Sequence, residues 1–338
     1  MATMVKAVAA LSHGQPLQKF EFTQGPIGAE QVEIAVETCG LCHSDLSMLK
    51  NEWGRTKYPL VPGHEVVGTV VAIGERVRML QVGTRVGLGW ASESCLRCNP
   101  CLTGQQNLCI KGEETIVARH GGFAASVRCH EVWAVPIPAA VDAATAGPLF
   151  CGGITVFHPI VLAGVRPTDR VGVLGIGGLG HMALKFLSKW GCEVYAFTSS
   201  ESKRTEALAL GAHQVVNSRD KAQLAKIRGK LSFILSTVNV AMEWSAYLDC
   251  LSANGRLHFV GAVMQPLNVS PMALLMGQKV IGASPLGTPA TVVSMLDFCA
   301  RHQIAPTTES FPMSKVNDAL EHLESGKARY RIVLKNDL

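Results

Sequence analysis

The sequence has no apolar run long enough to cross a membrane. A membrane-spanning helix needs roughly 20 apolar residues in succession, and the most apolar region, residues 139–165, is repeatedly interrupted. The interruptions are Asp142, Pro148, Gly152, Gly153 and Pro159. The first residues also lack the charged segment and apolar core of a signal peptide. We therefore expect a cytoplasmic protein with no membrane partner.

Charge is also scarce. Charged residues make up only 17% of the chain, and the formal net charge is +5. The basic residues are dispersed and do not alternate with aromatic ones, so we expect no nucleic-acid partner. The sequence contains no internal repeat and no low-complexity tract. At 338 residues it exceeds one ordinary core, which predicts two domains.

Cysteine, by contrast, is abundant, with 11 residues. Because no secretory signal is visible, this number indicates metal binding rather than disulfides. The strongest pattern joins Cys95, Cys98, Cys101 and Cys109. Four thiolates can close a tetrahedral shell around zinc, and a closed shell has no open position, so this zinc would be structural. Zinc ribbons that bind nucleic acid separate two C-x-x-C pairs by roughly 15–20 residues, which is not the spacing here.

Residues 170–204 predict a dinucleotide site. Residues 170–174 have the pattern of a buried strand, residues 181–190 that of a helix, and residues 193–197 that of a second strand. A G-x-G-x-x-G motif stands between the first strand and the helix. Strand, glycine motif, helix and strand together form the dinucleotide-binding βαβ unit.

Each glycine of this motif has an expected task. Gly175 would make the tight turn, Gly177 would let a pyrophosphate approach the backbone, and Gly180 would let helix and strand pack closely. The helix N-terminus would then face the anion. The alternative is a glycine-rich turn with no ligand, but the motif in its full strand and helix context favours the cofactor.

The end of the second strand indicates which nicotinamide cofactor binds. A site for NAD has Asp or Glu about 20 residues after the glycines, whereas this chain has Thr198, Ser199 and Ser200 there. Lys203 and Arg204 follow. Small hydroxyls and two cations suit a 2′-phosphate, which predicts NADP(H). Alternatively, the two cations are solvated residues of the next expected helix, over residues 201–210.

Cys39 and Cys42 form a C-x-x-C pair in surroundings that alternate like β-strands. A thioredoxin-like redox pair would follow the first strand of a small βαβ domain, which is not found here. Two unrelated buried thiols are a second alternative. The functional interpretation is that Cys42 is a zinc ligand with His43, Ser44 and Asp45 around it.

His64 and Glu65 follow a Pro-Gly turn and are plausible zinc ligands. An isolated histidine near strands is more often a core or surface residue than a ligand. Spacing alone leaves both alternatives open, because no compact zinc motif such as H-E-x-x-H is present.

The later part of the chain predicts a parallel, doubly wound sheet. Short apolar segments alternate there with helical ones, over residues 214–216, 232–235, 256–260 and 279–282. The loops after parallel strands lie at the ligand crevice. We therefore expect cofactor contacts from Thr237, Val238, Val260 and Gly261.

Several motifs together resemble one family. They lie at residues 39–46, 51–54, 63–65, 95–109, 147–155, 175–180 and 328–334. The chain is similar to the zinc-dependent medium-chain alcohol dehydrogenases, to their cinnamyl-alcohol-dehydrogenase branch, and to the bacterial NADPH-dependent aldehyde reductases of that branch. The resemblance implies an α/β protein. A discontinuous, mainly-β GroES-like catalytic domain would span residues 1–147 and 288–338, with a zinc lobe at about 90–112, and a Rossmann NADP-binding domain would span residues 148–287.

The resemblance also implies roles for single residues. A catalytic zinc would be held by Cys42, His64 and Cys151, with Glu65 as an alternate ligand, so that each chain carries two zinc ions. Asp45 would orient the His64 ring. The implied cofactor contacts are His43, Thr155, Gly178, Leu179 and Arg331.

Proton transfer is expected to differ from that of many relatives. Ser44 would pass a proton to the substrate oxygen. Related dehydrogenases commonly have a His three residues after this serine, but here the residue is Ser47. The relay must therefore end through water or cofactor hydroxyls.

The implied activity is reversible reduction of aldehydes to primary alcohols with NADPH, over a broad aliphatic and aromatic range. Trp53 and Trp90 would line the substrate pocket, unless they only pack the lobe. One alternative is a cinnamyl or other aromatic alcohol dehydrogenase, and a distant one is a non-catalytic NADPH-binding zinc protein. A homodimer is expected, joined through the sheet edge near residues 279–283.

Overall fold

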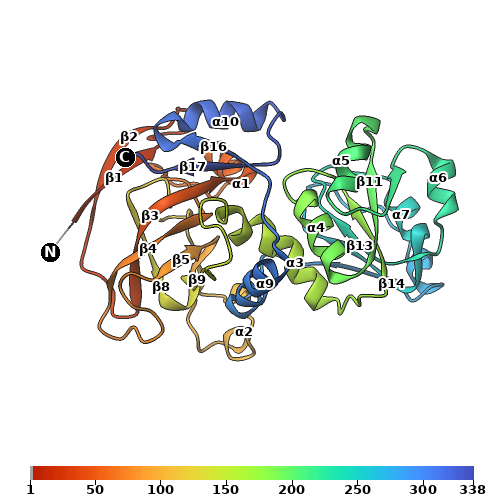
Figure 1. Ribbon diagram of the computed structural model, residues 1–338, viewed down its shortest axis with the longest axis horizontal. Coiled ribbons are helices and arrows are strands. Elements are labelled where there is room, and N and C mark those ends of the chain that lie inside the picture. Colours follow the sequence, from red (N-terminus) through yellow and green to blue (C-terminus); the bar gives the residue numbers. More distant parts are fainter. Residues whose placement is uncertain (1–2) are drawn as a thin grey trace. The chain divides into compact units, whose positions relative to one another are not determined.

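The computed structural model describes residues 3–338. The chain divides into two units (Figure 1). Unit 1 contains Met1–Cys151 and Thr288–Leu338, and unit 2 contains Gly152–Gly287. Unit 1 is thus built from two segments of the chain that are separated by the whole of unit 2.

The largest sheet of unit 1 has seven strands and is mostly antiparallel. Six strands follow the order β16 (Thr308–Pro312), β17 (Arg331–Lys335), β3 (Gln31–Leu41), β4 (Val66–Ile73), β5 (Arg85–Leu88) and β9 (Val135–Pro136), and β8 (Ser126–His130) also pairs with β3. In β3, Val32, Ile34 and Val36 are buried. Alternate side chains of a strand point to opposite faces, so this spacing turns one face of β3 to the core.

The described part of unit 1 also contains two smaller ribbons and four α-helices. One ribbon pairs β1 (Thr3–Ala9) with β2 (Gln18–Gln24), and the other pairs β6 (Ala91–Glu93) with β7 (Glu113–Glu114). The cysteine lobe lies between β6 and β7 in the chain. The helices are α1 (His43–Leu49), α2 (Asn99–Leu102), α9 (Pro289–His302) and α10 (Val316–Glu324).

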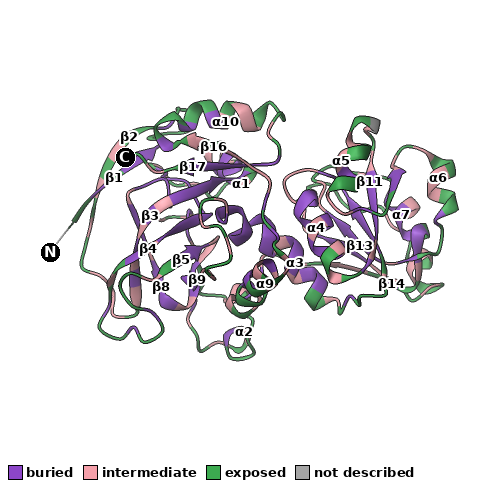
Figure 2. Cartoon of the chain, viewed as in Figure 1, coloured by how far each residue is buried: buried purple, intermediate pink, exposed green. Residues whose placement is uncertain are grey.

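Unit 2 contains one parallel sheet of six strands. Its order is β12 (Gln214–Asn217), β11 (Glu193–Thr198), β10 (Arg170–Leu174), β13 (Leu231–Ser236), β14 (Leu251–Phe259) and β15 (Val280–Ala283). Counted along the chain, this is the order 3-2-1-4-5-6 of the doubly wound dinucleotide fold. The buried strands stand out in Figure 2. The predicted α/β class, with a parallel sheet and a discontinuous mainly-β domain, is confirmed.

Helices of unit 2 alternate with its strands. They are α3 (Gly152–Leu162), α4 (Gly180–Trp190), α5 (Arg204–Ala209), α6 (Lys221–Lys226), α7 (Trp244–Cys250) and α8 (Pro271–Leu275). The helix expected over residues 201–210 is shorter, because Glu201–Lys203 forms a 3₁₀ turn before α5 begins. The first strand, β10, has the bounds that its apolar pattern predicts.

One strand of unit 1 is displaced from its expected position. The sequence of residues 123–127 predicts a strand there, whereas β8 begins only at Ser126. Phe123 and Ala125 bond instead to β1, where Val8 N donates to Phe123 O and Ala125 N donates to Lys6 O. The segment therefore changes partner before it joins β3.

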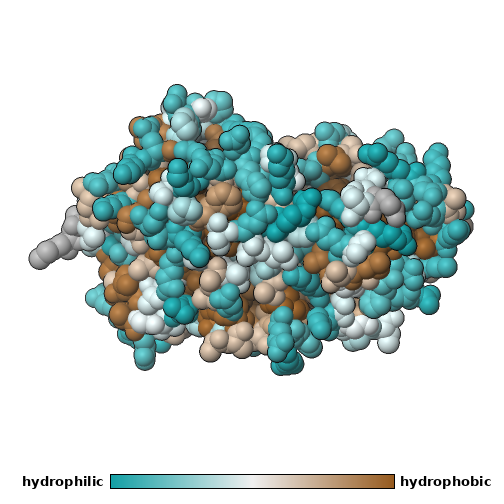
Figure 3. All heavy atoms as spheres, turned by 45° about the horizontal axis from the view of Figure 1, so that its top comes forward, coloured by the Kyte–Doolittle hydropathy of each residue, from teal (hydrophilic) through white to brown (hydrophobic). Residues whose placement is uncertain are grey.

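Hydrophobic and hydrophilic residues are intermixed on the surface drawn in Figure 3. Such a mixture is ordinary, because apolar atoms make up more than half of a typical protein surface. Within residues 3–338, none of the helices has both the length and the apolar character that a membrane span requires.

Candidate metal and cofactor sites

Four buried side chains of unit 1 bring potential metal ligands together. The ligand atoms of Cys42, His64, Glu65 and Cys151 all lie within 4.8 Å of one another. The sulfurs of Cys42 and Cys151 are 3.9 Å apart, and His64 Nε2 is 3.3 Å from Cys151 Sγ. A tetrahedron with zinc–sulfur bonds of about 2.3 Å has edges of roughly 3.8 Å. The two thiols and the imidazole therefore fit a single zinc ion.

The pairing of β3 with β4 brings three of these residues together. Cys42 follows β3, and His64 and Glu65 precede β4. Gly40 N donates to Glu65 O at 2.9 Å. A Cβ atom at Gly40 would lie 1.9 Å from Glu65 Oε2, so only glycine leaves room for the buried carboxylate. Cys151 completes the group from the chain segment that links unit 1 to α3.

Asp45 fixes the orientation of the His64 ring. This fully buried carboxylate accepts hydrogen bonds from His64 Nδ1 at 3.0 Å, Gly63 N at 2.9 Å and Cys42 N at 3.0 Å. The bond to Nδ1 leaves His64 Nε2 directed at Cys151. Carboxylates commonly hold metal-binding histidines in this way, and they thereby set the tautomer of the ring.

Burial and mutual contact shift the pKa values in this cluster. The hydrogen bond from Cys151 lowers the pKa of Cys42 well below its usual value and raises that of Cys151. The pair is thus disposed to hold one negative charge. Burial raises the pKa of Glu65 to about 7, although Arg331 opposes the shift.

Arg331 forms a buried ion pair with Glu65. Its side chain extends from β17, in the second segment of unit 1, to a residue of the first segment. The resemblance implied that Arg331 contacts the cofactor, and nothing in the sequence indicated its ion pair with Glu65. Glu65 Oε2 is buried without a hydrogen-bond partner among residues 3–338, as an oxygen in reach of a metal would be.

The hydroxyls near the cluster have distinct partners. Cys42 Sγ lies 3.7 Å from Ser44 Oγ, a long contact that involves sulfur. Ser47, at the position where relatives commonly have His, donates to Glu52 Oε2 at 2.6 Å. His43 is the exposed first residue of α1.

Two indole rings lie beside His64. The centroid of Trp90 is 5.0 Å from that of the imidazole, and the planes are 82° apart. Trp53 packs edge-on against Trp90 at 5.8 Å. Both indoles are half-buried and contact a small apolar cluster around Met48 and Leu60. These contacts show that the two residues pack the surroundings of the histidine.

The redox alternative for Cys39 and Cys42 finds no support in the geometry. Cys39 Sγ bonds to Gly40 O at 3.6 Å, whereas the sulfur near Cys42 belongs to Cys151. All 11 cysteines are free thiols. Because a Cβ atom at Gly63 would lie 2.9 Å from Cys39 Sγ, this thiol fills a tightly packed position.

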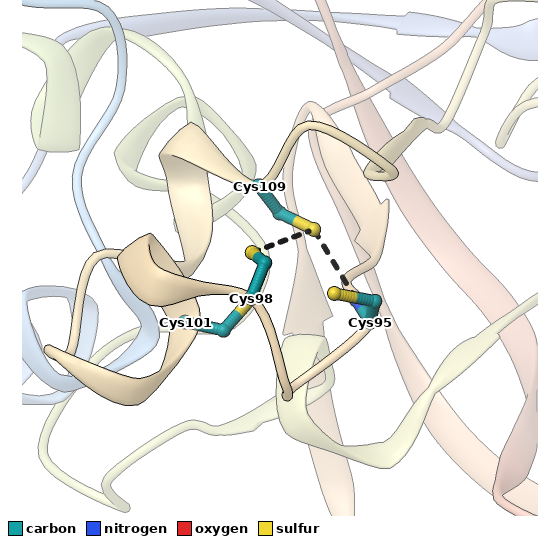
Figure 4. A group of neighbouring side chains, drawn as sticks. All are labelled: Cys95, Cys98, Cys101 and Cys109. Carbon is teal, nitrogen blue, oxygen red and sulfur yellow. Dashed lines mark hydrogen bonds between the residues drawn. The ribbon is translucent and has the colours of Figure 1, made fainter.

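Four cysteines converge in the lobe between β6 and β7 (Figure 4). The sulfurs of Cys95, Cys98, Cys101 and Cys109 lie within 4.8 Å of one another, and that of Cys98 is 3.8 Å from that of Cys109. The Cys95 pKa is lowered to about 6, chiefly by the hydrogen bond from the Arg97 backbone. This shell also matches the edge of a zinc–thiolate tetrahedron, roughly 3.8 Å.

The glycine motif of unit 2 has the geometry that its spacing predicts. Gly175 has φ +86°, which disfavours other residues. A Cβ atom at Gly180 would lie 1.9 Å from Gly175 O, whereas at Gly177 it would meet nothing within 4 Å. Gly178 and Leu179 lead into α4, which has no side-chain cap. The open space over Gly177 and the uncapped N–H groups suit an anion.

One of the predicted cofactor residues that follow β11 contacts the glycine turn of unit 2. Lys203 Nζ donates to Ile176 O at 3.1 Å, so the cation lies beside the glycine turn. Thr198 ends β11, and Ser199 and Ser200 follow it, exposed and half-buried respectively. Arg204 is exposed and bonds instead to Val215 O at 3.4 Å.

The loops after β13 and β14 approach each other closely. Thr237 Oγ1 donates to Gly175 O at 2.9 Å, which ties its loop to the glycine turn. A Cβ atom at Gly261 would lie 2.1 Å from Val238 O. Val260 and Gly261 line a hollow of about 340 Å³ at the carboxyl ends of β14 and β15. Thr155 lies in α3, half-buried.

Comparison with known proteins places this geometry in a family. Residues 28–139 match the alcohol dehydrogenase GroES-like domain, and residues 178–301 match the zinc-binding dehydrogenase family. The chain is 54% identical over 333 residues to aldehyde reductase AdhA of Synechocystis sp., covering 98% of this chain and 99% of that protein.

Two solved structures share the whole fold. The cinnamyl alcohol dehydrogenase SbCAD4 of Sorghum bicolor has a TM-score of 0.93 and 35% identity, with 98% of each chain covered. The CAD of Helicobacter pylori, complexed with NADP(H), has a TM-score of 0.90 and 29% identity, with 99% of each chain covered. The chain therefore belongs to the zinc-dependent medium-chain alcohol dehydrogenases, in their cinnamyl-alcohol-dehydrogenase branch.

Proposed function

We propose that the protein reduces aldehydes to primary alcohols with NADPH, reversibly, at a zinc ion held by Cys42, His64 and Cys151. The observation that carries this proposal is the convergence of these buried ligand atoms within 4.8 Å. Three protein ligands leave one position for a substrate oxygen. When bound, zinc would polarise the carbonyl group and the nicotinamide would supply the hydride.

The surrounding residues would hold this site in one geometry. Asp45 keeps the His64 ring in the tautomer that presents Nε2 to the metal. Arg331 neutralises Glu65 within the protein and keeps that carboxylate next to the ligands. Glu65 Oε2 is then available as an alternate ligand.

Ser44 would supply the proton that turns the carbonyl oxygen into the hydroxyl of the alcohol. Its position beside Cys42 supports this assignment. Ser47 has its own hydrogen bond to Glu52 and takes no part in the proposed transfer. Water or the hydroxyls of the cofactor would complete the path to solvent.

The preference for NADPH is supported by the small hydroxyls and the cation at the end of β11. Ser199 and Ser200 leave space where an NAD site has a carboxylate, and Lys203 lies beside the glycine turn. The Helicobacter pylori relative, complexed with NADP(H), is consistent with this choice. A cellular NADPH pool normally drives reductions, which supports the proposed direction.

The two indoles suggest the class of substrate. Trp53 and Trp90 surround the histidine side of the site with apolar rings, which suit aliphatic chains or aromatic rings better than polyols. A cinnamyl or other aromatic alcohol dehydrogenase is the second candidate, favoured by these same rings and by the Sorghum relative. A non-catalytic NADPH-binding zinc protein is a distant third.

One experiment separates these candidates. The purified protein is assayed with NADPH and NADH side by side on short aliphatic, long aliphatic and aromatic aldehydes, and its zinc content is measured. We expect two zinc ions per chain, faster turnover with NADPH, and activity across the panel. Cofactor binding without turnover of any aldehyde would contradict the proposal and favour the non-catalytic candidate.

We also propose a homodimer joined through β15, the edge strand of the unit 2 sheet. Met272, Met276 and Val280 are exposed near this edge. Sedimentation of wild type against Val280→Lys tests it, because a charge on the edge should release monomers if the strands pair there.

A further inference from the structure

A short loop of unit 1, residues 51–56, carries Trp53, one of the two indoles near His64. The loop follows α1 and is anchored at its base, where Thr56 Oγ1 donates to Met48 O at 2.6 Å. Met48 is 1% exposed, so this end of the loop is fixed to the core of unit 1. The indole lies in the tip of the loop, which precedes this anchor.

Two side chains of the tip contact the ribbon formed by β6 and β7. Trp53 packs on Trp90, which directly precedes β6, with the ring centroids 5.8 Å apart. Two residues later in the loop, Arg55 Nη2 donates to Glu114 Oε1 of β7 at 2.8 Å. Glu114 lies opposite Ala91 in the register of the ribbon, so it is close to Trp90. An aromatic contact and an ion pair thus hold the loop to neighbouring positions of one ribbon.

The strand β7 contains two successive glutamates with different partners. Successive side chains of a strand point to opposite faces. Glu113 accordingly pairs with Arg119, whereas Glu114 pairs with Arg55. The two carboxylates are alike in chemistry, but it is Glu114 that ties β7 to the loop of Trp53. Glu113 is therefore an internal control for any effect of charge on this strand.

The Arg55–Glu114 pair is partly exposed. The side chain of Arg55 is 50% exposed and that of Glu114 is 29% exposed. Ion pairs with this exposure contribute little to the stability of a protein, and salt weakens them. Removal of the pair should therefore leave unit 1 folded. Its effect is to be sought in the position of the loop, and not in the stability of the chain.

The position of the loop matters because its indole bounds the proposed aldehyde site. The ring of Trp90 is 5.0 Å from that of His64, a proposed zinc ligand, and Trp53 packs on Trp90. The proposed function places the carbon chain of the aldehyde against these two rings. The contact between the indoles therefore sets how much room the chain has, and the ion pair two residues from Trp53 holds that contact together.

We propose that the Arg55–Glu114 ion pair is a latch that keeps Trp53 on Trp90 and thereby favours compact aldehydes over bulky ones. This inference rests on the proposed function, because it requires an aldehyde at the zinc site. A bulky aldehyde displaces Trp53 and separates the ion pair, whereas a compact aldehyde leaves both contacts intact. The free energy of the pair therefore opposes the reaction of bulky aldehydes alone, and it appears as a difference in specificity.

The test measures kcat/KM for two uncharged aldehydes, butanal and 2-naphthaldehyde, with the zinc-loaded full chain at saturating NADPH. The variants are Arg55→Met, Glu114→Gln, the double variant, and an exchanged variant that combines Arg55→Glu with Glu114→Arg. Met and Gln keep the side-chain length at each position while removing its charge. The matched control is Glu113→Gln, the same change one residue away on the other face of β7. Melting temperature and zinc content check that each variant is folded.

We expect Arg55→Met and Glu114→Gln each to raise the ratio of kcat/KM for 2-naphthaldehyde to that for butanal by about 2- to 5-fold, the effect of one partly exposed ion pair. The double variant should show no further rise, because both changes remove the same pair. The exchanged variant restores the pair with its charges reversed, so its ratio should return close to the wild-type value. Glu113→Gln should leave the ratio unchanged.

Salt provides a second test on the wild-type protein. At about 1 M salt the Debye length falls to about 3 Å, which weakens an exposed ion pair. The wild-type ratio should therefore rise with salt, and it should rise more than that of Arg55→Met, which has no pair left to weaken. Because both aldehydes are uncharged and are compared at the same NADPH concentration, the effect of salt on cofactor binding cancels in the ratio.

Four results would each overturn the inference while leaving the proposed function intact. They are an unchanged ratio for Arg55→Met, a raised ratio that persists in the exchanged variant, an equal rise for Glu113→Gln, and equal salt dependence of wild type and Arg55→Met. If the exchanged variant does not fold, the salt comparison decides. A wild-type protein that reduces neither aldehyde would instead refute the proposed function itself, so the two failures are distinguishable.

Discussion

The substitution Ser199→Asp tests the proposed cofactor preference most directly. Ser199 is exposed just after β11, where a carboxylate would face the 2′-phosphate of NADPH. Two unit charges about 4 Å apart repel by about 1 kcal/mol in water, and a phosphate carries about −1.5 to −2 charges. Because the position is exposed, the value for water applies, and we expect NADPH binding to weaken by about 2 kcal/mol, or roughly 30-fold.

The same carboxylate should improve the binding of NADH. It can accept a hydrogen bond from the 2′-hydroxyl of the ribose, and hydrogen bonds to charged groups contribute about 1.5–3 kcal/mol. Together, the two effects should reduce the ratio of kcat/KM for NADPH to that for NADH by roughly 100-fold or more. The assay compares the two cofactors at one saturating aldehyde concentration and one fixed ionic strength.

A matched control carries the same charge at the other end of the sheet. Ser252 lies at the beginning of β14, and in a parallel sheet this is the edge opposite the carboxyl ends. Ser252→Asp should leave the cofactor ratio unchanged. If Ser199→Asp also left it unchanged while the variant stayed folded, the proposed phosphate site would be wrong.

Three further predictions concern the metal sites and the glycine turn. Ser44→Ala should reduce turnover at least 100-fold, as expected when a group that transfers a proton is lost. Ser47→Ala should have little effect, because the Ser47 hydroxyl bonds to Glu52. Equal losses of turnover for the two variants in steady-state assays would refute the proposed proton relay. Cys109→Ser should lower the zinc content from two ions to one per chain and lower the melting temperature, and an unchanged metal analysis would contradict a four-thiolate shell. Gly180→Ala should abolish cofactor binding in titrations because its methyl group would lie 1.9 Å from a backbone oxygen, and wild-type affinity would show that the turn is not rigid.

Local patterns in the sequence predicted much of the fold. The apolar segments of β10 and α4, with the glycines between them, lie next to one another in the chain, so their pattern reveals the whole βαβ unit. The start of β8 could not be predicted from a local pattern. It depends on where the chain stops hydrogen-bonding to β1, which it does through Phe123 and Ala125. Strand partners are chosen by tertiary contacts that no local window contains.

The candidate sites also contain some residues that a local pattern predicts and others that depend on tertiary contacts. The four cysteines of the lobe are close in sequence, and their spacing alone predicted a shared metal. Cys151 is far from His64 in sequence, so only the family resemblance suggested it as a ligand. The Arg331–Glu65 and His258–Ser284 contacts arise from strand register, and no local pattern of residues indicates either pair.

The two-segment construction of unit 1 has a consequence for the order in which the protein matures. The strand β17, which pairs with β3 and brings Arg331 to Glu65, is translated only after all of unit 2. Until then, residues 38–41 of β3 lack the strand that pairs with them on this edge, and the Glu65 carboxylate lacks the counter-charge of Arg331. We therefore expect nascent chains that stop before residue 331 to hold zinc poorly at Cys42 and His64, even though unit 2 is already complete.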